Sequence, residues 1–530
     1  MIKGSRFRVP GPSSLRKHSE LRRINSGSLL PYGIIFLGLV FFLATIRSGH
    51  RAGDFSMLLQ HAVNMVDGAS YDQSSYVQNP NAVSVGTTSY PPGIPVLIAP
   101  LYALFGYDLV PMKVLMVLLF AAALVVFGLT TERLLPRSVF MLMLFDLSFT
   151  PYFWEFKDNV ESDFPFLLPL FVVLFLIART GSSPDSKAAS IRRGAVLGAL
   201  MYVAVGMRTI GLALIVSLFL FDIVKGRSLR PTHHFLAAAV TLGVLMVIQS
   251  LVLPIDGGTY GQAFIERMNS PAKFVASLVL NAKYYILAVT GRILMTNGHG
   301  TTWADVMLLL SIGPFAVGFW QRLRHDLGIL EVFTVVYAGV LLVWPFRQPN
   351  YLIPLIPLLA FYLFYGIGHI ARNMPQHRRR LAFAGVFVLL AATYLQRYAT
   401  LSFDRIPHDV MSEASMEFYA YVRSNLDEAD GIVTRLPREV ALFTTRPTTP
   451  PRHPRSGPNG DAEPYSTEEV FAIINRSQEI GFSYVAAGPR GFQYHREILP
   501  LWNMLDDNQE LFEPVWSNEE WRLFKVPSAE

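Results

Sequence analysis

The sequence predicts an α-helical polytopic membrane protein with about 11 transmembrane helices and a small C-terminal extracytoplasmic α/β domain. Of its 530 residues, 52% are hydrophobic and only 16% are charged, whereas soluble domains carry about 25% charged residues. Apolar runs of about 20 residues recur along most of the chain, and each is long enough to cross a bilayer core of about 30 Å. After residue 400 the charge rises and the apolar runs shorten.

The composition also excludes several classes of site and partner. The chain contains no cysteine, which rules out disulfides, thiolate metal sites and cysteine nucleophiles. Its net charge of +6 does not indicate a nucleic-acid partner, because the basic residues gather in short loops between apolar runs, as in the cytoplasmic loops of membrane proteins. We therefore expect contacts with membrane lipids and none with nucleic acid.

Residues 1–28 form a basic N-terminus, in which seven lysines and arginines stand against one glutamate. Such a flank is expected to stay in the cytoplasm. The first apolar run, residues 29–46, resembles a signal peptide in length. No small-residue cleavage site follows it, so we interpret it as an uncleaved anchor. The loop of residues 47–93 then lies outside the membrane.

This first outer loop carries the features to which we assign the chemistry. Asp54 stands where the first apolar run releases the chain, and a helical pattern follows it over residues 55–66. The loop closes with Tyr90-Pro91-Pro92. Because proline fixes φ and restrains the residue before it, we expect these three residues to set the direction of the backbone.

The other apolar runs fill the rest of the transmembrane domain, residues 29–400. Residues 94–105 are apolar but short and interrupted by prolines, which predicts a re-entrant or interfacial segment. Ten further spans are expected at about residues 109–130, 138–154, 164–178, 194–207, 211–224, 235–253, 304–320, 328–344, 351–370 and 381–398. With eleven spans, every basic turn falls inside and every mixed or acidic turn falls outside. This parity places the C-terminal domain on the same side as Asp54.

Residues 401–530 are expected to form the extracytoplasmic domain, because helical patterns alternate there with short β-type runs. Helices are predicted at residues 411–423, 467–480 and 492–505, and strands at residues 431–434, 483–487, 511–516 and 521–526. A proline-rich linker, residues 446–464, divides these elements.

Ionisable side chains gather at the outer ends of the predicted spans. The set comprises Asp54, His61, Asp158, Glu161, Asp163, Arg208, Lys283, Arg292 and Arg347. Structural interpretations exist for single members: Asp54 and Asp163 suit helix N-caps, and His61 suits a solvated helix face. Trp154 suits an interfacial aromatic belt. The combination of carboxylates and guanidinium groups at one face favours a catalytic site, since each ionisable group near the bilayer is costly.

The combination suits transfer of a sugar from a polyprenyl phosphate. Arginine binds phosphate through paired, charge-assisted hydrogen bonds, and a carboxylate can take the proton of an incoming hydroxyl. Such a donor carries no nucleotide, and the sequence indeed lacks a phosphate-cradling glycine loop, an HExxH motif and a serine-nucleophile elbow.

Four stretches resemble the C-type integral-membrane glycosyltransferases, in particular their protein mannosyltransferase and lipid A aminoarabinose transferase branch. These stretches are Gly53-Asp54 with Ala62, Gly68 and Tyr71; Tyr90-Pro91-Pro92-Gly93 with residues 94–106; Glu161-Ser162-Asp163-Phe164; and Arg347 with residues 351–357. They occur in order along nearly the whole chain. Gln348-Pro349-Asn350 separates Arg347 from Tyr351 where the family is usually tighter.

By this resemblance, Asp54 is the catalytic base, and Asp163 or Glu161 positions the acceptor or the base. Arg208 and Arg347 hold the donor phosphate. Further phosphate-binding candidates are Lys283 and Arg292, and the substrate loop is Tyr90, Pro91 and Pro92. No metal site is assigned: a divalent metal ion could assist with the phosphate, but no set of ligands in the sequence requires one.

The predicted reaction is an inverting single displacement with an oxocarbenium-like transition state. The acceptor hydroxyl belongs to a lipid, a glycan or a protein, and the expected location is the inner or plasma membrane. The main alternative is a transporter or a lipid-linked-glycan flippase, and a third is a non-catalytic scaffold with an outer sensing domain. Transporters often show paired halves with broken helices near mid-membrane, and the sequence shows no such pairing.

Overall fold

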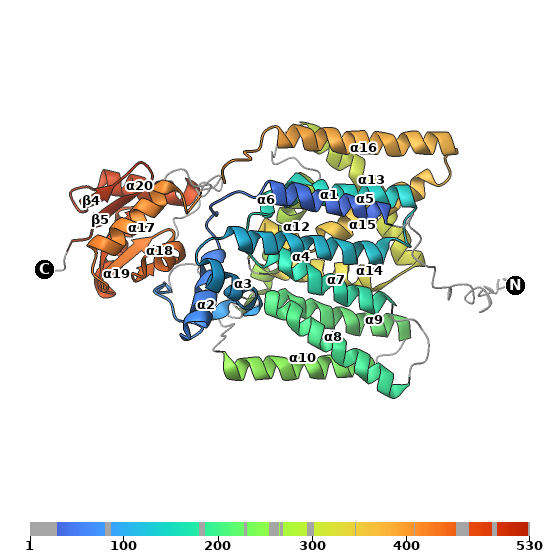
Figure 1. Ribbon diagram of the computed structural model, residues 1–530, viewed down its shortest axis with the longest axis horizontal. Helices are drawn as coiled ribbons and strands as arrows, with labels where there is room; N and C mark the ends of the chain where they lie inside the picture. The colour runs from blue at the N-terminus through green and yellow to red at the C-terminus, as the bar shows by residue number, and fades with distance from the viewer. Residues whose placement is uncertain are drawn as a thin grey trace.

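The computed structural model describes residues 29–527, apart from 80–85, 180–185, 227–229, 254–263, 266–268, 294–301, 345, 407–408, 452–465 and 490–494. The predicted cytoplasmic N-terminus, residues 1–28, lies outside the described residues. Figure 1 shows two parts: a bundle of long, roughly parallel helices, and a sheet-containing part at one end of that bundle. Helices α2 (Phe55–Asp67) and α3 (Gly93–Phe105) lie at the end of the bundle that faces this second part.

Helices occur at each of the eleven expected spans. Their bounds are α1 Leu30–Ala44, α4 Val110–Thr131, α5 Arg137–Phe149 followed by α6 Pro151–Phe156, α7 Asp163–Arg179, α8 Lys187–Met207, α9 Ala213–Gly226, α10 His233–Val252, α13 Thr302–His325, α14 Ile329–Val343, α15 Ile356–Ala371 and α16 Gln376–Tyr398. A further helix, α12 (Pro271–Ile293), lies between the expected spans at residues 235–253 and 304–320.

By length and composition, five of the described helices can each cross a membrane, or six if one bent pair counts as a single span. The chain is therefore a multi-pass membrane protein, and the count of eleven crossings stays a prediction. Helix α10 has the surface expected of a helix that crosses a membrane. It leaves one apolar strip exposed along its length, formed by Val240, Val244, Val247 and Leu251, as a helix that faces lipid does.

Small residues and aromatic rings build the interior of the bundle. Gly198 of α8 lies against the backbone of Ala238 in α10, and Gly318 of α13 lies against the backbone of Tyr362 in α15. Small residues allow helix backbones to approach closely in a membrane. Rings fill the centre, where Phe120 of α4 stacks on Phe164 of α7 with ring centroids 4.2 Å apart.

The second part is a mixed five-stranded sheet in the order β2-β1-β3-β5-β4. Its strands are β1 Gly431–Thr434, β2 Thr448–Thr449, β3 Phe482–Ala487, β4 Glu513–Ser517 and β5 Arg522–Lys525, and its helices are α17 Glu413–Asn425, α18 Pro437–Thr444, α19 Thr467–Glu479 and α20 His495–Asp507. Strands β1, β2 and β3 pair in parallel, whereas β3, β5 and β4 pair antiparallel. Elements α18 and β2 are absent from the sequence-based expectations, because both are short; α18 lies just before the predicted proline-rich linker, and β2 lies within it.

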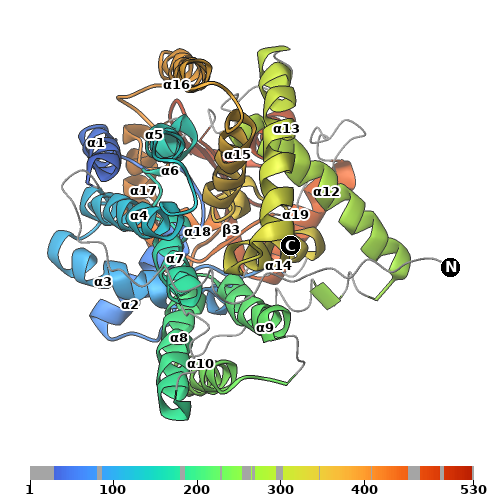
Figure 2. The same cartoon turned by 90° about the vertical axis from the view of Figure 1, so that its right-hand side faces the viewer.

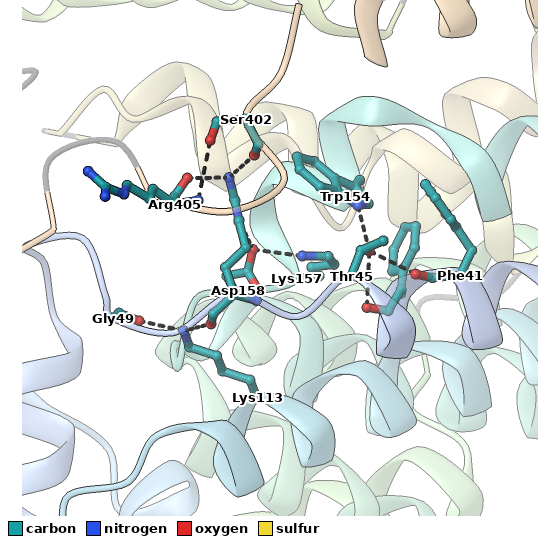
Figure 3. Close-up of polar contacts among 11 residues, drawn as sticks. Phe41, Thr45, Gly49, Lys113, Trp154, Lys157, Asp158, Ser402 and Arg405 are labelled. Carbon is teal, nitrogen blue, oxygen red and sulfur yellow. Dashed lines mark hydrogen bonds and ion pairs between the residues drawn. The ribbon is translucent and has the colours of Figure 1, made fainter. Parts of the chain in front are cut away.

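A buried group of charges joins the end of α1 to the loop before α7 (Figure 3). We call Arg47, Lys113, Trp154, Lys157 and Asp158 the Asp158 cluster. Arg47 Nε and Lys157 Nζ each lie 2.7 Å from Asp158 Oδ2. Both cations lie over the Trp154 ring, 4.6 and 4.4 Å from its centroid, and Lys113 Nζ donates to the Arg47 carbonyl at 2.7 Å.

The Asp158 cluster corrects two expectations. The side chain of Asp158 is 1% exposed and Trp154 is fully buried. Trp154 is therefore not part of an interfacial belt, and Asp158 is not available at the outer surface. The reason is that the chain that leaves α16 covers the cluster: the Phe403 ring lies 4.8 Å from the Trp154 ring, centroid to centroid. Arg47 Nη1 donates to the carbonyl of Ser402 at 3.0 Å and to that of Arg405 at 3.3 Å.

Candidate active site

Three carboxylates from two segments approach one another at the end of the bundle. Asp54 directly precedes α2, Glu161 lies in the loop before α7, and Asp163 is the first residue of α7. Glu161 lies beside Asp54 because residue 53 is glycine: a Cβ added at Gly53 would lie only 2.7 Å from Glu161 Oε1. A side chain at position 53 would push the Glu161 carboxyl away.

The surroundings of Glu161 favour its protonated form. Burial raises its pKa well above the ordinary carboxyl value, and the charges of Asp163 and Asp54 raise it further. The nearby guanidinium groups of Arg208 and Arg51 act in the opposite direction. A carboxyl group whose pKa is raised by burial and by neighbouring charges is typical of a functional site.

Asp54 is held by two donors on a single oxygen. Tyr90 Oη donates to Asp54 Oδ1 at 2.8 Å, and Arg438 Nη1 donates to the same atom at 3.1 Å. Arg438 Nη1 also lies 2.5 Å from Tyr90 Oη. The Asp54 backbone occupies the N-cap position of α2, but its side chain makes no capping hydrogen bond. The capping interpretation therefore fails for the carboxylate, which is 53% exposed.

The Tyr90-Pro91-Pro92 segment sets the orientation of the Tyr90 side chain as well as the direction of the backbone. Tyr90 is extended, with φ −92° and ψ 125°, as expected before proline. Tyr71 Oη donates to the Tyr90 carbonyl at 3.0 Å, and Pro92 is the N-cap of α3. These constraints direct the Tyr90 hydroxyl at Asp54.

Asp163 and Arg208 form an ion pair between the start of α7 and the end of α8. Asn350 Nδ2 donates to the other Asp163 oxygen at 3.4 Å, and the Arg208 guanidinium lies 5.3 Å from the centroid of the Tyr351 ring. Asn350 and Tyr351 both belong to the 3-10 helix η5 (Pro349–Leu352). The Gln348-Pro349-Asn350 insertion thus supplies a hydrogen-bond donor to Asp163.

Two of the remaining phosphate-binding candidates, Arg347 and Lys283, are exposed. Arg347 is exposed in the segment before η5, and Lys283 is exposed on α12. Among the described side chains, neither forms a hydrogen bond or an ion pair with the three carboxylates. The side chain of Arg292, near the end of α12, lies outside the described part of the chain. Figure 2 shows α12 on the opposite side of the bundle from α2 and α3.

His61 does not face solvent, contrary to expectation. It is completely buried, with its ring edge-on to Tyr71 at a centroid distance of 4.2 Å. Burial lowers its pKa to about 4. The expectation failed because Tyr71 and Tyr90, from the rest of the first outer loop, lie against the His61 ring, and because α2 also packs on α3 and on α18 of the C-terminal domain.

Several residues of the site escaped the sequence analysis. Arg438 is 384 positions away from Asp54, and no local pattern marks it. Asn350 and Tyr351 were noted only as neighbours of Arg347, and Arg51 was not singled out. Among the described residues, no group of three or more histidine, aspartate or glutamate side chains could hold a metal ion, and no step below is assigned to a metal.

The fold matches solved structures along nearly its full length. ArnT from Cupriavidus metallidurans bound to undecaprenyl phosphate aligns over 95% of this chain and 98% of its own, with a TM-score of 0.55 and 12% identity. The archaeal oligosaccharyltransferase AglB from Archaeoglobus fulgidus, in complex with an inhibitory peptide and a dolichol-phosphate, aligns over 88% of this chain and 70% of its own, with a TM-score of 0.57 and 11% identity. The arabinofuranosyltransferase AftD from Mycobacteria aligns over 94% of this chain but 40% of its own, with a TM-score of 0.52 and 15% identity. No family model and no curated protein sequence matches the chain.

Proposed function

We propose, from the fold that this chain shares with the C-type integral-membrane glycosyltransferases, that it transfers a sugar from a polyprenyl-phosphate donor to an acceptor hydroxyl. The observation that carries this proposal is the convergence of Asp54, Glu161 and Asp163 with the guanidinium groups of Arg208 and Arg438. A general base and phosphate-binding cations are the two requirements of this reaction.

In the proposed reaction, the acceptor hydroxyl attacks the anomeric carbon of the sugar from the side opposite the phosphate. Asp54 takes the hydroxyl proton as the new C–O bond forms. The bond between the anomeric carbon and the phosphate oxygen breaks, and the lipid phosphate leaves with the bonding electrons. The configuration inverts, and the transition state is oxocarbenium-like.

Arg208 is the best-placed phosphate ligand. A guanidinium carries several N–H donors in a rigid plane, and Asp163 uses only the Nη1 side of Arg208. Asp163 would thus position Arg208 and leave its other N–H groups for the phosphate. Arg347 remains a candidate as an exposed side chain next to η5, and Lys283 and Arg292 remain further candidates.

Glu161 is suited to donate a hydrogen bond. Its raised pKa favours a neutral carboxyl group beside Asp54. A protonated Glu161 would bind a sugar hydroxyl or a phosphate oxygen without adding negative charge. We place the reaction at the extracytoplasmic face of the cell membrane, with a lipid, a glycan or a protein as acceptor.

The test is sugar transfer by the purified chain, using a polyprenyl-phosphate-sugar pool extracted from membranes. Asp54→Asn should lower transfer about 100- to 10,000-fold, the range that general-base catalysis contributes. Asp67→Asn, which removes an exposed carboxylate at the other end of α2, is the matched control and should keep wild-type activity. Full transfer by Asp54→Asn would refute the assignment of the base. Mass spectrometry of cell-envelope lipids and glycans with and without the protein would identify the sugar and separate this proposal from a flippase.

A further inference from the structure

We propose that Arg438 of the C-terminal domain is a positioning residue for this reaction: together with Tyr90 it fixes one oxygen of Asp54 and leaves the other for the acceptor. The inference rests on the proposed function and adds to it that the C-terminal domain completes the active site. The sequence alone left the role of this domain open between gating the site, recognising the acceptor and merely covering the site.

Both hydrogen bonds to the Asp54 carboxylate are made to the same oxygen. Arg438 and Tyr90 both donate to Asp54 Oδ1. Within the part of the chain that the structure describes, Asp54 Oδ2 has no hydrogen-bond partner, and the side chain is half exposed. A carboxylate held in this way keeps one rotamer and presents one oxygen, which is what a general base requires.

Arg438 is itself held firmly. Its side chain is only 16% exposed, and the guanidinium lies 5.4 Å from the centroid of the Tyr90 ring and 5.6 Å from that of Tyr76. The next residue of α18, Glu439, accepts a hydrogen bond from the Gly53 N–H at 3.0 Å. Two consecutive residues of the C-terminal domain therefore bind two consecutive residues at the start of α2.

The domain is joined to the first outer loop by backbone pairing as well. Thr448 N donates to the Ser75 carbonyl at 2.9 Å, and Val77 N donates to the Thr448 carbonyl at 2.7 Å. This parallel bridge between Tyr76 and Thr448 adds the loop to the β2 edge of the sheet. Ser75 Oγ also donates to the Thr445 carbonyl at 2.9 Å.

The start of the loop is attached independently. His50 N donates to Asp409 Oδ1 at 2.8 Å, and Val410 N donates to the His50 carbonyl at 2.8 Å. The C-terminal domain thus binds the loop both before Asp54, at His50, and after it, at residues 75–77. These two attachments determine the position of Arg438 over the carboxylate.

The experiment compares Arg438→Gln, Arg438→Lys and Asp54→Asn in the full-length protein. A hydrogen bond to a charged group contributes enough to change a rate about 10- to 100-fold, so Arg438→Gln should lower kcat by about that factor and leave the donor KM within about threefold. Arg438→Lys should recover part of the loss. Added to Asp54→Asn, Arg438→Gln should cause no further loss, because its effect acts through Asp54. An unchanged kcat in Arg438→Gln, or an equal loss in the Asp54→Asn background, would overturn the proposal.

Two controls separate positioning from misfolding. Arg446→Gln removes a buried arginine of the same domain that donates only to main-chain carbonyls, those of Arg423 and Leu426 among them; it should lower the Tm and spare kcat per folded molecule. Because the chain has no cysteine, Ser75→Cys with Thr445→Cys should cross-link through a short bismaleimide, with equal yield when Arg438→Gln is added. Failure of this pair to cross-link in the otherwise wild-type protein would overturn the proposal even where sugar transfer is intact. A wild-type protein without sugar transfer would instead refute the proposed function.

Discussion

Removing the negative charge of Asp158 should destabilise the whole protein. The carboxylate accepts hydrogen bonds from Arg47 Nε at 2.7 Å, from Lys157 Nζ at 2.7 Å and from the Arg47 backbone N–H at 3.1 Å. The side chains of Arg47, Lys157 and Asp158 are 2%, 0% and 1% exposed. Asp158→Asn keeps the shape but leaves two buried cations without their anion, and breaking a buried ion pair in this way costs about 3–5 kcal/mol.

The assay is thermal unfolding of the detergent-solubilised protein. At about 2 °C per kcal/mol for a large domain, Asp158→Asn should lower the Tm by about 6–10 °C. Asp326→Asn is the matched control: Asp326 is 57% exposed and lies 3.7 Å from Arg322, and exposed pairs contribute about 0–1 kcal/mol. If the two variants melted within about 2 °C of each other, the Asp158 cluster would not be the anchor inferred here.

Two further predictions concern pH, each read from the Tm as a function of pH. Because the pKa of Glu161 is raised, the folded chain binds more protons than the unfolded chain above the ordinary carboxyl range, so stability should fall as pH rises. Glu161→Gln should reduce that fall; parallel wild-type and variant curves would contradict it. The pKa of His61 is lowered from 6.5 to about 4, so stability should fall as pH drops through that window, and His61→Phe should lessen the loss. An unchanged acid limb in His61→Phe would show that His61 does not carry this effect.

The membrane part of the fold was predictable because its signals are local. Apolar runs of sufficient length placed α1 at Leu30–Ala44 and α14 at Ile329–Val343 within two residues of expectation. The boundary of α8 was missed, because this helix continues from the apolar run back to Lys187 in the basic loop. The expected span at residues 138–154 is divided, because the chain bends at Thr150 before Pro151. The resemblance to C-type glycosyltransferases is confirmed at the level of the fold.

The candidate site was predictable only where charge stands out against an apolar background. Asp54, Asp163 and Arg208 lie at the ends of apolar runs, and the structure places them at the same end of the bundle. Arg438 was missed because it lies in a charged domain, where an arginine carries no signal. His61 was misjudged because its ring packs against Tyr71 and Tyr90, which follow α2 in the same loop and give no sign in the sequence that they fold back over the helix.

The addition of residues 75–77 to the edge of the β2 strand limits how this protein can be rebuilt. The β2 edge of a C-terminal domain taken from another protein of this fold would not match the first outer loop of this chain. Chimeras that exchange the domain alone should therefore assemble poorly, whereas chimeras that exchange it together with the first outer loop keep the backbone pairing between loop and sheet. For protein design, the first outer loop and the C-terminal domain therefore have to be exchanged as one unit.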